Sequence, residues 1–282
     1  MERIERALEV ARLHRHGLTE AASAPGPATM TMMPSAASFA VAMAEEQAMP
    51  RIDQAPLAQL ASREQLRERY VVFPDEPSPA SLSYKMLRTQ ILQRARQHSM
   101  RCIGVVSAAS GEGKTVTAIN LSLSLAAESN QSVILADLDF KRPSIARTLG
   151  LECESGLESF FTRDATIESL WRRFEGIPRL AVLPTMAPLA ASSELLAGAA
   201  GAELLKNLRN VSGESLVIAD LPPALLSDDV LAIAPSLDGV VIVVTEERTR
   251  REDLQRVFEL LRSTPVIGTV LNASADAEAR TY

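Results

Sequence analysis

The stretch CIGVVSAASGEGKTVTAINLSLSLAAES, residues 102–129, decides the fold of this 282-residue chain. It reads as a short apolar strand over 102–107, a glycine-rich turn and a helix over 114–129. The turn matches the phosphate-binding pattern G-x-x-x-x-G-K-[ST], except that Ala108 stands where the first glycine usually is. A strand before the turn and a helix after it are the context that this pattern requires.

The chemistry of this loop predicts nucleotide binding. Gly111 and Gly113 let the backbone curl tightly, so that consecutive N–H groups can point at phosphate oxygens. The following helix adds its positive N-terminal end. Lys114 is expected to reach the β- and γ-phosphates, and Thr115 to ligate Mg²⁺. The alternative is an ordinary glycine-rich turn without a ligand. The residues predicted to contact the nucleotide here are Ser110, Gly111, Glu112, Gly113, Lys114, Thr115 and Val116.

Short apolar runs alternate with helical patterns along the rest of the chain. Because several of these runs lack polar alternation, they indicate strands buried on both faces of a mostly parallel sheet flanked by helices. We therefore predict an α/β P-loop NTPase fold. The predicted strands are 102–107, 132–136, 180–183, 216–219, 240–245 and 266–271. The predicted helices are 79–98, 114–129, 193–210 and 248–263.

Three aspartates follow predicted strands at the edge of the sheet where ligands bind. Asp137 and Asp139 come after the second strand, and Asp220 after the fourth. Carboxylates there can hold Mg²⁺, directly or through its waters, or accept a proton from an attacking hydroxyl. We assign Thr115, Asp137 and Asp220 to the metal. The alternative for each aspartate is a helix N-cap, which is our interpretation of Asp228 and Asp229.

Composition excludes several other classes. The net charge of −6 argues against a general nucleic-acid binder, and two cysteines do not make a disulfide framework. No apolar run approaches the ~20 residues of a membrane-spanning helix, so we expect a cytoplasmic protein. The predicted divisions are a short amphipathic helix over 1–17, a disordered, mostly flexible linker over 18–78, the main domain over 79–272 and a flexible tail over 273–282. The first helix is either a frayed leader or a docking helix.

As a set, SAASGEGKT (107–115), ILADLDFKRPS (134–144) and LVIADLPP (216–223) resemble the bacterial tyrosine kinases of capsule and exopolysaccharide assembly. These belong to the wider group of deviant-Walker P-loop ATPases. The resemblance implies ATP and Mg²⁺ as cofactors and catalytic roles for Lys114, Asp137 and Asp139. It also places Asn272 near the adenine. Partition ATPases usually carry an extra lysine in the loop, which positions 108–110 lack.

The resemblance also implies a partner and a phosphate acceptor. Such kinases work with a membrane-anchored polysaccharide co-polymerase, so recruitment to the inner face of the cell membrane and homo-oligomer formation are expectations. Their tails usually carry several tyrosines, whereas this one ends in Tyr282 alone. Three functions follow: a tyrosine autokinase with Tyr282 as acceptor, a nucleotide-switched ATPase that regulates polysaccharide assembly without phosphorylation, and, more distantly, a partition-type ATPase.

Overall fold

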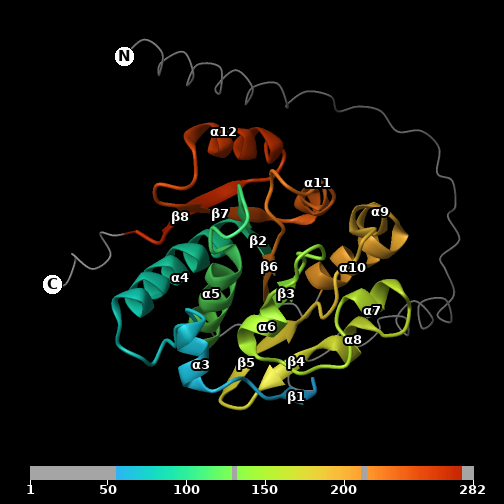
Figure 1. Cartoon of the computed structure of the whole chain (residues 1–282), viewed down its shortest axis with the longest axis horizontal. Helices are drawn as coiled ribbons and strands as arrows, with labels where there is room; N and C mark the ends of the chain where they lie inside the picture. Colours follow the sequence, from blue (N-terminus) through green and yellow to red (C-terminus); the bar gives the residue numbers. More distant parts are fainter. Residues whose placement is uncertain (1–54, 129–131, 211–214, 275–282) are drawn as a thin grey trace, which may run out of the picture. The chain divides into compact units, whose positions relative to one another are not determined.

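A mostly parallel sheet forms the centre of the described fold. The computed structural model describes residues 55–128, 132–210 and 215–274, coloured in Figure 1. The strand order is β1-β4-β5-β3-β6-β2-β7-β8, and among these pairs only β4 and β5 run antiparallel. The predicted mostly parallel sheet flanked by helices is confirmed. The strands are β1 (Leu57–Ala58), β2 (Cys102–Ser107), β3 (Val133–Asp137), β4 (Arg172–Phe174), β5 (Ile177–Leu183), β6 (Leu216–Asp220), β7 (Gly239–Thr245) and β8 (Val266–Asn272).

Burial on both faces explains why the central strands appear in the sequence as continuous apolar runs. Residues of β2, β3 and β6 are buried throughout, so each strand contributes side chains to both faces. Ile134 packs into one apolar cluster, whereas its neighbour Leu135 packs into the other. Asp137 pairs with Asp220 in the β3–β6 register. The parallel direction therefore brings the two predicted carboxylate strands to one edge at the same level.

Helices cover both faces of the sheet (Figure 1). One apolar cluster includes side chains of the first four described helices, and the other includes side chains of the later ones. The first group is α3 (Arg63–Glu68), α4 (Pro79–His98), α5 (Lys114–Glu128) and α6 (Ile145–Leu149). The second is α7 (Glu158–Phe161), α8 (Ile167–Leu170), α9 (Ser192–Ala197), α10 (Ala199–Asn210), α11 (Asp229–Ile233) and α12 (Arg251–Leu260), with a 3₁₀ turn at Ala234–Ser236. None of the described helices is long and apolar enough to cross a membrane.

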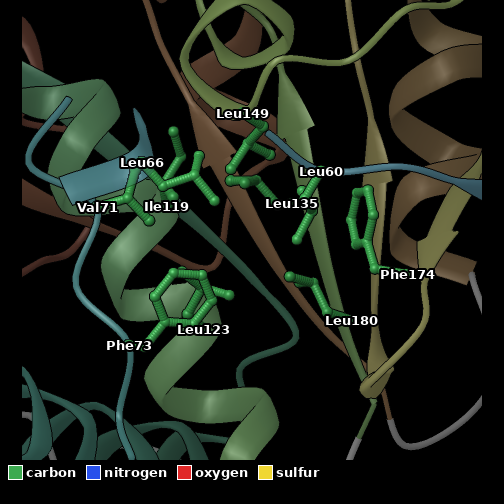
Figure 2. Close-up of a pocket in the computed structure, with 10 residues that line it drawn as sticks. All are labelled: Leu60, Leu66, Val71, Phe73, Ile119, Leu123, Leu135, Leu149, Phe174 and Leu180. Atoms are coloured by element: carbon green, nitrogen blue, oxygen red, sulfur yellow. The ribbon is translucent and has the colours of Figure 1, made fainter. Parts of the chain in front are cut away.

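The segment before α4 belongs to the fold. β1 pairs with β4, and α3 begins at a capping box formed by Ser62 and Gln65. Figure 2 shows Leu66, Val71 and Phe73 meeting α5 and the sheet, where the ten apolar side chains leave no room for a water molecule. The linker prediction is therefore wrong for residues 55–78. The elements of this segment are short, two residues in β1 and six in α3, so they give no extended sequence pattern, and the segment packs on a surface that the rest of the chain supplies.

Two predicted helices differ in their bounds. The helix predicted over 193–210 is divided at Gly198, whose backbone is extended, into α9 and α10. The helix predicted from residue 248 begins at Arg251, because the turn after β7 passes through Glu247 at φ 60°. The predicted N-terminal helix, most of the linker and nearly all of the C-terminal tail lie outside the described residues.

Candidate nucleotide site

The loop between β2 and α5 has the backbone that a phosphate loop requires. Gly111 and Gly113 have φ values of 79° and 86°, a region that favours glycine. Ala108 is buried, so a small side chain fits where the pattern usually has glycine. Glu112 is also buried, and its Oε2 accepts the Ala109 N–H at 2.8 Å. The Glu112 carboxylate therefore stabilises the loop conformation through a hydrogen bond inside the loop.

Lys114 lies between two carboxylates at the end of this loop. Its Nζ is 2.8 Å from Asp139 Oδ2 and 3.4 Å from Asp220 Oδ1. The Lys114 side chain is 9% exposed, and those of Asp139 and Asp220 are 3% and 0% exposed. The structure thus brings together the lysine and two of the three aspartates that the sequence singled out.

Asp137 has a different set of partners. Its Oδ2 accepts the backbone N–H groups of Ser144 and Ile145, both at 3.0 Å, and its Oδ1 accepts the Asp139 N–H at 3.3 Å. Because Ser144 and Ile145 begin α6, this carboxylate lies at the positive end of that short helix. Asp137 therefore fixes the loop that carries Asp139.

Burial and the neighbouring charges change the pKa values of the groups in this cluster. Burial raises the pKa of Asp137 well above its usual range, and the Asp220 carboxylate raises it further. Burial also raises the pKa of Asp220, although Lys114 and Thr115 oppose that shift. Burial lowers the pKa of Lys114, but its acidic neighbours outweigh this and leave the pKa raised. Lys114 is therefore protonated at neutral pH and holds the cluster together.

Thr115 has the surroundings expected of a magnesium ligand. Its hydroxyl donates to Asp220 Oδ2 at 2.6 Å and accepts from the Ser144 hydroxyl at 3.1 Å. Oxygen atoms are the ligands that Mg²⁺ prefers, and it usually keeps waters and binds substrate phosphates as well. The hydroxyl and carboxylate oxygens of Thr115 and Asp220, with Asp137 beside them, fit that chemistry. Ser144 was missed by the sequence analysis.

Three residues at or just after the ends of β7 and β8 donate hydrogen bonds to backbone carbonyls of the phosphate loop. Arg248 donates to the carbonyls of Ser110 and Gly111, and Thr245 and Asn272 donate to the carbonyl of Glu112. Of these three donors only Asn272 was predicted from the sequence to belong to the site. Thr245 could have been found, because it ends a parallel strand at the same edge as Asp220. Arg248 lies 137 residues from Gly111, and no local pattern marks it.

Asp228 occupies the N-cap position of α11, as predicted, whereas Asp229 is the first residue of that helix. Neither makes a side-chain cap at α11. Asp228 Oδ1 instead accepts from Lys141 Nζ at 2.8 Å, and Asp229 accepts from the hydroxyls of Ser192 and Ser193 at 2.8 and 2.6 Å. Hydrogen bonding to Lys141 lowers the pKa of Asp228 to about 2. These contacts join the loop after Asp139 to α9 and α11.

Two predicted site residues remain. Val116 is half-buried in the first turn of α5, next to Thr115. Tyr282, the predicted phosphate acceptor, lies outside the described residues. The structure therefore gathers the phosphate loop and the aspartates, while the position of the acceptor rests on the sequence.

Comparisons with known proteins agree with this geometry. Residues 98–279 match the family described as "ParA: NUBPL iron-transfer P-loop NTPase". Tyrosine-protein kinase YwqD of Bacillus subtilis is 29% identical over 209 residues, which cover 73% of this chain and 86% of YwqD. Succinoglycan biosynthesis transport protein ExoP of Rhizobium meliloti is 31% identical over 64% of this chain, but the match spans only 23% of ExoP.

A solved structure shares the fold. The kinase domain of the Escherichia coli tyrosine kinase ETK superposes with a TM-score of 0.66 at 20% identity, covering 80% of this chain and 91% of that domain. Together with the named relatives, this confirms the predicted resemblance to bacterial tyrosine kinases. Nucleotide binding follows from the P-loop family itself.

Proposed function

The chain belongs to the ParA family of P-loop NTPases, and from this premise we propose that it is an ATP-dependent protein-tyrosine kinase of exopolysaccharide or capsule biosynthesis. The single observation that carries the proposal is the contact of Lys114 with Asp139 and Asp220 beside the phosphate loop. This arrangement joins a phosphate-binding cation to buried carboxylates. The choice of a tyrosine hydroxyl as the phosphate acceptor rests on similar proteins that are named tyrosine-protein kinases.

ATP fits the loop through Lys114 and the N–H groups of residues 110–116. Thr115, Asp137 and Asp220 would hold Mg²⁺, which would neutralise charge on the phosphates when bound. Lys114 would exchange its carboxylate partners for phosphate oxygens. Asp139 Oδ2 forms an ion pair with Lys114. This oxygen would therefore lose its partner when Lys114 turns to the phosphates.

Transfer would form a bond between the tyrosine oxygen and the γ-phosphorus and break the bond between that phosphorus and the β–γ bridging oxygen. ADP leaves with the electron pair, and the tyrosine proton passes to a carboxylate. Asp139 Oδ2 is our choice of acceptor, because Asp137 remains occupied by the N–H groups of Ser144 and Ile145. Asp137 would keep Asp139 in position.

The test is incubation of the full chain with Mg-ATP, followed by mass spectrometry of every tyrosine. Phosphate on Tyr282 is expected, and both Lys114→Ala and Asp139→Asn should abolish it. Substitution of Tyr282 by Phe should remove the label without weakening ADP binding. The kinase proposal fails if no tyrosine of the chain or of an added polysaccharide co-polymerase becomes phosphorylated.

A second candidate is a nucleotide-switched ATPase that regulates polysaccharide assembly by changing its own association. The presence of only three tyrosines in the chain favours it over a multiply phosphorylated kinase. ATP-dependent association without phosphotyrosine, lost in Lys114→Ala, would support it. Size-exclusion chromatography with ATP, ADP and no nucleotide would measure that association and test for a homo-oligomer.

Two other members of the wider family fit less well. A partition-type ATPase is disfavoured by Ala108-Ala109-Ser110, which supply no extra loop lysine. Iron transfer would call for soft thiolate ligands, yet the chain has two cysteines and Cys102 is buried within β2. A membrane-anchored polysaccharide co-polymerase is the partner that we propose, and it would bring the chain to the inner face of the membrane.

A further inference from the structure

Three successive carbonyl groups of the phosphate loop accept hydrogen bonds from side chains at the end of β7, in the turn after it and at the end of β8. Arg248 donates from Nη2 to Ser110 O and from Nη1 to Gly111 O, each at 3.1 Å. The next carbonyl, that of Glu112, accepts from Thr245 Oγ1 at 3.0 Å and from Asn272 Nδ2 at 3.1 Å. No carbonyl between Ser110 and Glu112 is left without an external donor.

These bonds determine which way the loop's N–H groups point. A trans peptide holds its C=O and N–H on opposite sides of one plane, and the described residues contain no cis peptide bond. When the carbonyls of residues 110, 111 and 112 turn toward β7 and β8, the N–H groups of Gly111, Glu112 and Gly113 turn away from them. That opposite side is where a phosphate would accept hydrogen bonds.

Arg248 differs from the other two donors because it is charged and bridges two peptides. Its guanidinium is a rigid fork that can donate to two oxygens at once. Hydrogen bonds from a charged donor are stronger than neutral ones, and they polarise the peptide units that accept them. Its backbone is held by the turn in which Thr249 bonds both the Thr245 N–H and Glu112 Oε1. The loop is thus fixed by a segment outside the sequence motif.

We infer that Arg248 is a positioning residue of the nucleotide site, which orients the N–H groups of the phosphate loop toward the β-phosphate without touching the nucleotide. The inference rests on the nucleotide-binding part of the proposed function and is independent of the acceptor. It predicts a specific defect, in which recognition of phosphate weakens while recognition of the nucleoside does not.

The experiment measures Mg-ADP binding by titration calorimetry and adenosine binding by displacement of a fluorescent ADP analogue. Arg248→Ala removes both exposed hydrogen bonds to the loop. It is expected to weaken Mg-ADP about tenfold, which is about 1.4 kcal/mol, and to leave adenosine unchanged. Arg248→Lys should recover part of this loss, because an ammonium can replace the charge but not the fork. Arg256→Ala, an exposed arginine on α12, is the matched control and should bind both ligands as the wild type does.

The inference is overturned if Arg248→Ala binds Mg-ADP like the wild type, or if it weakens ADP and adenosine by the same factor. Should Arg248→Ala fail to fold, Arg248→Lys is compared with Arg248→Gln. An ADP affinity at least about threefold higher for Arg248→Lys than for Arg248→Gln supports the role of the charge. Equal ADP affinity of the two variants overturns it. Because binding involves no phosphoryl transfer, a chain that labels no tyrosine would refute the kinase proposal and leave this result standing.

Discussion

The ammonium group of Lys114 lies 2.8 Å from the carboxylate of Asp139, and both side chains are almost completely buried. Asp220 and Asp137 are buried beside them. One cation therefore compensates a group of carboxylates that burial would otherwise keep from ionising. Its removal should affect folding as well as nucleotide binding.

We expect Lys114→Met to destabilise the nucleotide-free chain more at pH 8 than at pH 5. Asp137 and Asp220 have raised pKa values in the folded state, so their contribution to stability is present below the usual carboxyl pKa and is lost as pH rises through the folded value. Without Lys114 these values rise further. The expected loss at pH 8 is about 3 kcal/mol.

Urea unfolding of the wild type and Lys114→Met at both pH values measures this difference. Lys206→Met, on the exposed side of α10, is the control and should show no pH-dependent change. An equal loss at pH 5 and pH 8 would mean that lost packing, and not unpaired charge, explains the effect.

Gly113→Ala should abolish nucleotide binding, whereas Gly176→Ala should not. A Cβ at Gly113 would lie 2.0 Å from Asn272 Nδ2, on a backbone with φ +86°. Gly176 has a similar φ of +82° but nothing within 4 Å of its Cβ position. Both variants incur the strain of an L-residue at positive φ, about 1 kcal/mol, and only the first displaces Asn272 from the loop. ADP titration and thermal unfolding of both variants separate these effects, and ADP binding by Gly113→Ala at wild-type affinity would contradict the prediction.

Asp229→Ala should destabilise the chain much more than Asp228→Ala. The Asp229 side chain is fully buried and accepts hydrogen bonds from Ser192 and Ser193. Ser193 keeps a second acceptor in Asp228 Oδ1 at 2.7 Å, so the loss of Asp229 leaves the buried Ser192 hydroxyl without its acceptor and should cost about 2 kcal/mol. Asp228 is exposed, and its ion pair with Lys141 is screened by solvent. Urea unfolding at pH 7 should give almost the wild-type midpoint for Asp228→Ala. Equal effects of the two substitutions would refute this account of α9 and α11.

The two cysteines should differ in reactivity at pH 8. Burial raises the pKa of the Cys102 thiol to about 12, and the thiolate is the reactive form. Cys102 should therefore resist iodoacetamide until the chain unfolds, while the partly exposed Cys153 reacts in the native state. Mass spectrometry of the alkylated peptides, with and without urea, measures both sites. Native labelling of Cys102 would show that β2 opens readily.

The centre of this fold could be predicted because each of its strands carries its own signal. β2 and β6 are continuous apolar runs buried on both faces, and each ends in a functional segment. β4 could not be predicted, because Arg172-Arg173-Phe174 has no strand pattern and pairs antiparallel with β5 at the margin of the sheet. The same holds for the site: Lys114 and Asp220 follow local motifs, whereas Arg248 reaches the loop only through the folded turn after β7.

Removal of residues 1–78 should destabilise the main domain, contrary to the boundary that the sequence suggested. Leu66 is 1% exposed and packs in the apolar cluster of Figure 2 with Leu135, Phe174 and Leu180. Without the segment these side chains would meet water, at about 25 cal/mol per Å² of apolar surface. A chain that begins at residue 79 should therefore unfold at a markedly lower temperature than one that begins at residue 55.

A point substitution tests the same contact without truncation. Leu66→Ala should cost about 3 kcal/mol, as for other buried leucines, whereas Leu82→Ala on the exposed side of α4 should cost little, because Leu82 is 60% exposed. Both are measured by urea unfolding, together with ADP binding. Because the cluster meets α5 at Ile119 and Leu123, beyond the first turn that carries Lys114 and Thr115, ADP affinity should be nearly unchanged in folded Leu66→Ala. If Leu66→Ala were as stable as Leu82→Ala, the segment before α4 would not contribute to the core.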